Sequence, residues 1–175
     1  MPSNVPAAPE GYRTINPFII TKDAAKVIEF CEDVFGGESQ TDALTYEPDG
    51  SILHSEVRIG DSLVQVADRQ PDWPYTPSLL QIYVDNLDET LAKAEKRGAS
   101  IVTRPTEFLG AMFSRIKDAQ GNMWWVYQYL GEVDWSAIGG EDGGEWDENA
   151  SWEPTKEATY IHDTLLEAMQ HLKDN

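Results

Sequence analysis

The stretch SILHSEVRIGDSLVQVAD, residues 51–68, predicts a β-hairpin and determines how its side chains divide between two faces. Gly60-Asp61 suits a two-residue turn of type II′, because glycine readily adopts the positive φ that this turn needs at its first central position. The turn places Glu56 opposite Gln65. Since side chains alternate along a strand, each face then has a fixed set. One face carries His54, Glu56, Arg58, Leu63 and Gln65, and the other carries Leu53, Val57, Ile59, Val64 and Val66.

This division predicts a hairpin whose apolar face packs under a helix. Its polar face then lies either in bulk solvent or in a binding site. Glu56 and Arg58 are compatible with an ordinary solvated ion pair, which stabilises a protein very little. The hairpin alone leaves both alternatives open.

The hairpin closes the first of two similar halves, and each half reads β-α-β-β-β, which indicates an internal repeat. In the first half we expect a strand at 15–21, a helix at 23–35 ended by Gly36-Gly37, a strand-like stretch at 39–47 and the hairpin. In the second half we expect a strand at 79–85, a helix of about ten residues opened by the capping box of Asn86 and Glu89 and ended by Gly98, and strands at 100–105, 111–117 and 123–130. The Pro-rich segment 70–77 joins the halves.

Charge and composition limit the classes of partner. The net charge of −18 argues against nucleic acid and against anionic membranes. No run of about 18 apolar residues is present, so no membrane span is predicted. The first residues show neither the basic nor the apolar region of a signal peptide, so a cytoplasmic protein is expected.

The single cysteine, Cys31, excludes an intramolecular disulfide and a thiolate zinc site. It shares one helical stripe with apolar residues of the predicted helix at 23–35. These residues are Ala24, Val27, Ile28, Val34 and Phe35. A buried structural thiol is therefore favoured over a nucleophile.

Residues 131–175 differ from the rest: they hold 12 acidic and 2 basic residues, a net charge of −10. This acidic C-terminal extension carries three tryptophans and ends in a predicted amphipathic helix at about 155–172. The tryptophans are Trp135, Trp146 and Trp152, and the apolar positions of the helix are Ile161, Leu165, Ala168, Met169 and Leu172. Such a helix needs a docking surface, on its own core or on a second subunit. We expect residues 1–10 to be disordered and residues 11–130 to form the folded domain, with modules at 11–69 and 78–130.

Taken together, PEGYRTINPFIITKDAAKVIEFCEDVFGGE at 9–38, the hairpin, and DAQGNMWWV at 118–126 resemble the vicinal oxygen chelate superfamily. This superfamily includes glyoxalase I, bleomycin-resistance proteins and extradiol dioxygenases, and the resemblance is more specifically to its PhnB-like branch. The resemblance covers residues 9–130. It implies an α+β fold in which two tandem βαβββ modules form a curved mixed sheet around a cleft. The acidic arm lies outside it.

In this family the helices cover the convex side of the sheet, so the opposite face lines the cleft. The resemblance therefore implies that His54, Glu56, Arg58 and Gln65 face the cleft. The same alternation in the second module adds Leu79, Gln81, Tyr83, Phe113, Arg115 and Trp125. Modules of the family often pair across chains, which implies a homodimer.

Metal-dependent members of the superfamily place ligands at four strand positions, and the resemblance puts these at Asn16, Gln65, Leu79 and Trp125. Leucine and tryptophan cannot bind a metal, and the two amides are weak ligands. We therefore expect no metal and no other cofactor. The alternative is a divalent metal held by His54, Glu56 and Gln65.

Three classes of function follow. The first is a metal-free small-molecule-binding protein, with Arg58, Gln65, Gln81, Tyr83, Phe113, Arg115 and Trp125 as ligand contacts; the acidic chain favours a cationic ligand. The second is a lyase, isomerase or dioxygenase acting on a small oxygenated substrate, with His54 and Glu56 as catalytic candidates, metal-dependent if they are ligands. The third is a structural or regulatory protein in which the C-terminal extension binds the partner.

Overall fold

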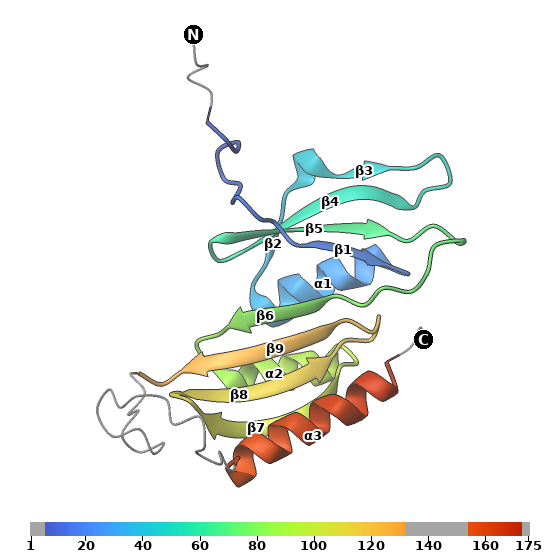
Figure 1. Ribbon diagram of the computed structural model, residues 1–175. Helices are drawn as coiled ribbons and strands as arrows, with labels where there is room; N and C mark the ends of the chain where they lie inside the picture. Colours follow the sequence, from blue (N-terminus) through green and yellow to red (C-terminus); the bar gives the residue numbers. More distant parts are fainter. Residues whose placement is uncertain (1–5, 132–153, 173–175) are drawn as a thin grey trace.

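The computed structural model describes residues 6–131 and 154–172, and it contains two modules followed by a C-terminal helix (Figure 1). The first module consists of β1 (Phe18–Thr21), α1 (Ala24–Phe35), β2 (Glu38–Ser39), the short 3-10 helix η1 (Thr41–Ala43), β3 (Thr45–Tyr46), β4 (Ile52–Ile59) and β5 (Ser62–Asp68). The second consists of β6 (Leu79–Tyr83), α2 (Leu87–Lys96), β7 (Ser100–Phe108), β8 (Ala111–Lys117) and β9 (Met123–Tyr129). The C-terminal helix is α3 (Lys156–Gln170). The expected α+β architecture of two tandem modules is confirmed.

Each module has its own mixed sheet. The strand order is β1-β5-β4-β2 in the first, with β3 on β4, and β6-β9-β8-β7 in the second. Among the described residues no strand of one sheet pairs with a strand of the other, so one continuous sheet is not formed. The modules meet instead through their helices, where Arg97 of the second module pairs with Glu29 at 3.0 Å and also with Asp33. The ring of Phe35 lies 4.9 Å from that of Trp124, so the two modules share one apolar core.

The hairpin of the first module has the predicted register. Glu56 lies opposite Gln65, and Arg58 lies opposite Leu63. Gly60 has a φ of 56°, and Asp61 is not among the described residues with positive φ, as a type II′ turn requires. The turn and the division of the hairpin into two faces are confirmed over residues 55–66.

Two predictions for the first module are wrong. Leu53 is exposed and does not pack under α1; Ile52 takes the core position. The reason is a β-bulge: Thr45 pairs with His54 and Tyr46 pairs with Ile52, so Leu53 is the extra residue on β4. The stretch 39–47 is also not one strand, because η1 interrupts it between two strands of two residues each.

One half of the predicted capping box of α2 is confirmed, and the thiol is buried as predicted. Asn86 accepts a hydrogen bond from the backbone N–H of Glu89 at 3.0 Å, which caps α2, while the Glu89 carboxylate pairs with Lys93. Cys31 is fully buried on the core side of α1, and burial raises the pKa of its thiol to about 12. The prediction of a buried structural cysteine is confirmed, because a protonated thiol is a poor nucleophile.

Helix α3 lies along β7 of its own chain (Figure 1). It is attached by polar contacts: Thr164 and Thr103 share a hydrogen bond at 2.7 Å, and the Tyr160 hydroxyl accepts one from the backbone N–H of Arg104 at 3.0 Å. None of its residues is fully buried. The three tryptophans predicted to help this arm pack lie outside the described residues. Among the residues that the structure describes, no helix combines the length and apolar character needed to cross a membrane.

The turn between β7 and β8 holds an unfavourable residue. Leu109 has a φ of 47° and is followed by Gly110 at 69°, the sign pattern of a type I′ turn. A β-carbon destabilises this conformation by roughly 1–2 kcal/mol, and asparagine tolerates it better than leucine does. We expect Leu109→Asn to raise the free energy of unfolding by about 0.5–1 kcal/mol in urea denaturation. Leu109→Ala, which keeps the strain, should give no gain; an equal gain from both variants would contradict this explanation.

Candidate functional site

The polar face of the hairpin centres on a buried carboxylate. Glu56 is 6% exposed, and its Oε1 atom accepts a hydrogen bond from the Tyr12 hydroxyl and lies 3.2 Å from His54 Nε2. The hydrogen bond to Glu56 is the main cause that raises the pKa of Tyr12. Burying a carboxylate without partners is unfavourable, and these two contacts offset that penalty. Tyr12 therefore covers a residue that the sequence suggested would line an open cleft.

The remaining predicted residues of this face are more accessible. Gln65 is half-buried opposite Glu56, and Arg58 donates to the backbone carbonyl of Gly11 at 3.4 Å. His54 keeps a third of its side chain exposed, and its ring meets that of Phe18 edge-on with centroids 6.2 Å apart. The structure thus brings His54, Glu56 and Gln65 together, with the N-terminal segment along one side.

The predicted residues of the second module also form one group, on the face of the sheet opposite α2. The Gln81 amide donates to the Tyr83 hydroxyl at 3.2 Å, and Gln81 lies beside Trp125 in the sheet register. Tyr127 contacts two members of the group: the centre of its ring lies 5.4 Å from that of Tyr83 and 4.8 Å from that of Phe113. Tyr127 is not among the residues predicted from the sequence, although it lies two residues after Trp125 and therefore shares its face.

Arg115 lies between aromatic rings beneath α3. Its guanidinium carbon is 4.9 Å from the centre of the Phe113 ring and 5.2 Å from that of Trp125. Its Nη1 atom donates to Thr103 Oγ1 and, at 2.6 Å, to the carbonyl of Ile161 in α3. Burial lowers the pKa of Arg115. Arg115 and Phe113 are 4% and 1% exposed, and since Arg115 is bonded to α3, a ligand can reach Arg115 only if α3 moves away.

An open groove lies on the sheet face of the first module, which we call the aromatic groove. Its volume is about 660 Å³, within the range of small-molecule sites. It is lined by Phe18, Ile20, Glu47, Pro48, Asp49, Leu53, Ala67, Asp68, Gln70 and Trp73. Phe18, Leu53 and Trp73 are 49%, 51% and 48% exposed, an unusual amount of open apolar surface for one site.

The charges of the aromatic groove are all of one sign. Glu47, Asp49 and Asp68 contribute carboxylates, and the lining contains no lysine or arginine. Asp68 has a structural role as well, because its two oxygens accept hydrogen bonds from the backbone N–H groups of Ala24 and Ile52 at 2.8 and 2.7 Å. Hydrogen bonds from the hydroxyl and backbone N–H of Ser51 lower the pKa of Asp49. The groove combines aromatic surface with negative charge.

The donor set does not fit the metal centre that the resemblance implies. Leu79 and Trp125 offer no ligand atom, and the Asn16 amide is engaged with the backbone of Arg13. Within residues 6–131 and 154–172 no group of three His, Cys, Asp or Glu side chains is arranged to hold a metal ion. His54 and Glu56 are adjacent, but Gln65, the third predicted ligand, offers only a neutral amide, which is a weak ligand.

Comparisons with known proteins agree with this fold. The family model described as the Glyoxalase/Bleomycin resistance protein/Dioxygenase superfamily matches residues 14–126. Uncharacterized proteins from Mycobacterium bovis and Mycobacterium tuberculosis are each 25% identical over 136 residues, which is 71% of this chain and 88% and 79% of theirs.

Solved structures of several branches resemble the chain. TioX from Micromonospora sp. ML1 has a TM-score of 0.52 and 19% identity, covering 69% of this chain and 98% of that one. The PhnB protein from Bacillus cereus has a TM-score of 0.53 and 15% identity, covering 66% and 99%. The fosfomycin resistance protein FosX from Mesorhizobium loti has a TM-score of 0.50 and 15% identity, covering 71% and 96%. The PhnB-like branch is thus one of several structural neighbours, and at these identities the likeness concerns the fold alone.

Proposed function

The chain belongs to the glyoxalase/bleomycin resistance/dioxygenase superfamily, and we propose that it is a metal-free protein that binds a small molecule in the aromatic groove. The observation that carries the proposal is the half-exposed set of Phe18, Leu53 and Trp73 on the sheet face opposite α1. Open aromatic surface beside fixed polar groups is typical of ligand sites. Stacking on Phe18 and Trp73 supplies the apolar contact area.

The ligand is an aromatic cation. Glu47, Asp49 and Asp68 line the aromatic groove with no basic residue among them, and the chain as a whole carries a net charge of −18. A cation gains from the aromatic faces as well as from the carboxylates. An anionic ligand of the same shape meets repulsion from all three acidic side chains.

The other predicted ligand contacts differ in how accessible they are to a ligand. Gln65, Arg58, Gln81 and Tyr83 remain accessible enough to contact a ligand that extends beyond the aromatic groove. Trp125 is half-buried and can take part as well, whereas Arg115 would do so only after α3 has moved. A homodimer is also proposed, since Leu79 and Tyr83 leave apolar surface exposed on the second sheet; light scattering after size-exclusion chromatography tests it.

Isothermal titration calorimetry with two ligands of matched shape tests the proposal. The full chain should bind 2-phenylethylammonium in a saturable manner and phenylacetate at least about tenfold more weakly, because the two share a phenyl ring of similar reach but carry opposite charges. The proposal fails if phenylacetate binds as well as the amine, or if neither the amine nor the larger cationic glycopeptide bleomycin binds.

A second candidate function is acid–base catalysis on a small oxygenated substrate, favoured by the contact between His54 and Phe18 at the edge of the aromatic groove. Buried Glu56 can hold the His54 ring in one orientation, and the exposed part of the ring can exchange a proton with a substrate. The hemithioacetal of methylglyoxal and glutathione is a test substrate. Turnover that persists with chelator and is lost in Glu56→Gln would support catalysis; no turnover by the wild type would exclude this reaction.

A further inference from the structure

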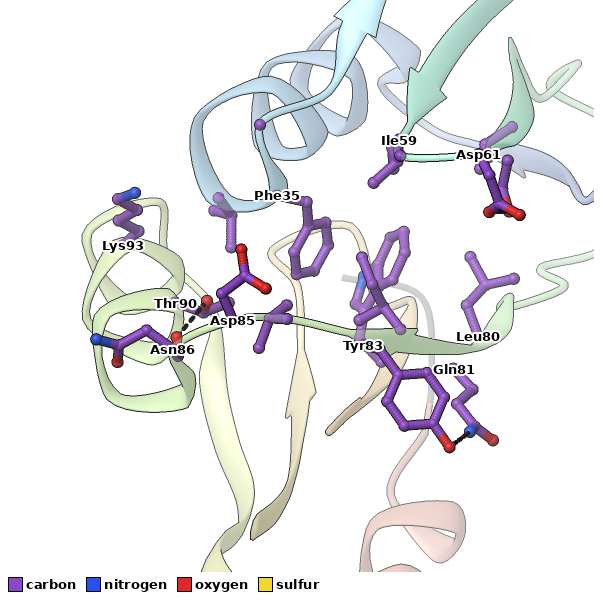
Figure 2. Close-up of a pocket in the computed structure, with 18 of the residues that line it drawn as sticks. Phe35, Ile59, Asp61, Leu80, Gln81, Tyr83, Asp85, Asn86, Thr90 and Lys93 are labelled. Atoms are coloured by element: carbon purple, nitrogen blue, oxygen red, sulfur yellow. Dashed lines mark hydrogen bonds between the residues drawn. The ribbon is translucent and has the colours of Figure 1, made fainter. Parts of the chain in front are cut away.

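A second cavity lies between the two modules, away from the aromatic groove, and Figure 2 shows its lining. This inter-module pocket has a volume of about 610 Å³. The first module contributes the end of α1 and the tip of the β4–β5 hairpin, including Phe35, Ile59 and Asp61. The second contributes the whole of residues 80–86 and the first turns of α2, including Lys93.

The strand that borders this pocket is an outer strand of its sheet. β6 pairs only with β9, so its other edge has no strand partner among the described residues. In a parallel ladder alternate residues direct both backbone groups to the same neighbour. The backbone N–H of Val84 donates to Tyr127 of β9, so the even-numbered residues face β9. Gln81 and Tyr83 therefore direct their N–H and C=O groups to the open edge.

The side chains of Gln81 and Tyr83 do not occupy the pocket. In Figure 2 they point away from Phe35, to the opposite side of β6, where they hydrogen-bond to each other. Their contribution to the pocket lining is consequently the backbone. Unpaired strand edges are normally blocked by charge, proline or a covering element, because they pair readily with other chains. Here the edge runs along a cavity instead.

The walls of the pocket are apolar, and the charged side chain of its lining that has no ion-pair partner among the described residues is acidic. The rings of Phe35 and Trp124 meet at a tilt of 52° at one side, and Ile59 and Leu80 also line the pocket. Lys93, the one basic residue of the lining, is paired with Glu89 at 2.7 Å. Asp85 is exposed and has no hydrogen bond or ion pair with any described residue.

We propose that the inter-module pocket binds an extended peptide segment of a partner protein, which adds a strand to β6 and places a basic side chain at Asp85. Outward backbone groups recur every second residue, about 6.6 Å apart along a strand, and this spacing matches another extended chain. Apolar side chains of the segment fill the space beside Phe35 and Trp124. The segment is basic because Asp85 is the only charged residue of the lining that forms no ion pair within the part of the chain that the structure describes, and its carboxylate is negative. The protein as a whole is strongly acidic as well.

Fluorescence polarisation with a labelled pentapeptide, Leu-Lys-Val-Lys-Leu, tests the proposal on the full chain. Saturable binding is expected. A version N-methylated at all four peptide amides cannot donate to a neighbouring strand from either edge, and a version with Glu in place of Lys reverses the charge. Each should bind at least about tenfold more weakly, roughly 1.4 kcal/mol. Equal binding of either control peptide, or no binding of the parent peptide, would overturn the proposal.

Two variants test the site itself. Gln81→Pro removes an N–H that points to the open edge, where proline is tolerated without loss of a ladder hydrogen bond. Asp85→Asn removes only the charge. Each should weaken peptide binding about tenfold, whereas Asp72→Asn, an exposed carboxylate outside the pocket lining, should leave it unchanged. Concentration-dependent self-association that Gln81→Pro abolishes would show that a second copy occupies the edge, and would overturn the assignment to a partner peptide.

Discussion

Asp118→Asn is expected to lower the free energy of unfolding by about 2–4 kcal/mol, because Asp118 accepts four hydrogen bonds inside the protein. Its Oδ1 atom accepts from the backbone N–H groups of Gln120 and Asn122, at 3.0 and 2.9 Å. Its Oδ2 atom accepts from the Asn122 side chain at 3.0 Å and from Trp124 Nε1 at 3.1 Å. An asparagine presents an NH₂ group to two of these donors and leaves them unpaired.

The consequences extend beyond the turn. Trp124 is buried in the core that joins the two modules, so a shift of its indole disturbs the contact with Phe35. Urea denaturation followed by circular dichroism measures the loss. Asp72→Asn is the matched control, since Asp72 is exposed, and it should change stability by less than about 0.5 kcal/mol. A loss below about 1 kcal/mol in Asp118→Asn, the lower limit for leaving one buried donor unpaired, would contradict this role of Asp118.

The pH dependence of this effect has a definite sign. Burial raises the pKa of Asp118, and it outweighs the hydrogen bonds from Trp124 and Asn122, which lower it. A raised folded-state pKa contributes stability that is complete below the unfolded-state pKa, about 3.9, and is lost as the pH rises through the folded-state pKa. Asparagine does not titrate. The difference in free energy of unfolding between wild type and Asp118→Asn should therefore be largest at acid pH and should decrease as the pH rises through the folded-state pKa of Asp118. A difference that increases with pH would contradict the raised pKa of Asp118.

Trp73→Ala is expected to weaken binding of 2-phenylethylammonium by roughly 10- to 30-fold, about 1.4–2 kcal/mol. Trp73 is the largest side chain of the aromatic groove, and half of its surface is open to stack on a ligand. The residue lies in the segment between the modules, so its truncation leaves the core unchanged.

Calorimetric titration of the variant measures the effect. Tyr46→Ala is the matched control: Tyr46 is another exposed aromatic residue of the first module, but it does not line the aromatic groove. Its affinity should match that of the wild type. Equal losses in both variants, or no loss in Trp73→Ala, would contradict the placement of the ligand.

The parts of the fold that follow local rules could be predicted from the sequence. The type II′ turn at Gly60 fixes the register of Glu56 against Gln65, because glycine supplies the positive φ and side chains alternate from there. Asn86 marks the start of α2 for a similar reason, since its side chain caps the nearest free N–H groups.

Other features depend on contacts between distant segments. The bulge at Leu53 arises from pairing with β3, whose two residues give too short a pattern to recognise. Tyr12 reaches Glu56 across 44 positions of the chain, and Arg115 meets the Ile161 carbonyl across 46. The hydrophobic periodicity of a sequence does not indicate contacts between such distant residues. Three of the nine candidate site residues, Glu56, Phe113 and Arg115, are therefore buried where accessible positions were expected.

The aromatic groove shows the same division. Phe18 joins Gln65 in the sheet register only because β1 pairs in parallel with β5. Trp73 comes from the segment at 70–77, which the sequence indicated only as a joint between modules. Local patterns predict which strands form, whereas the groove depends on how a strand, a bulge and a connecting segment meet.

Mapping the bound ligand by amide chemical shifts is the most direct test that a small molecule binds in the aromatic groove. Two-dimensional ¹H–¹⁵N spectra of the full chain would be recorded during titration with 2-phenylethylammonium. We expect the largest shifts at Phe18, Leu53, Ala67 and the indole N–H of Trp73. Shifts centred instead on Asp85 and Lys93 in the inter-module pocket, or spread without saturation over the acidic surface, would contradict it.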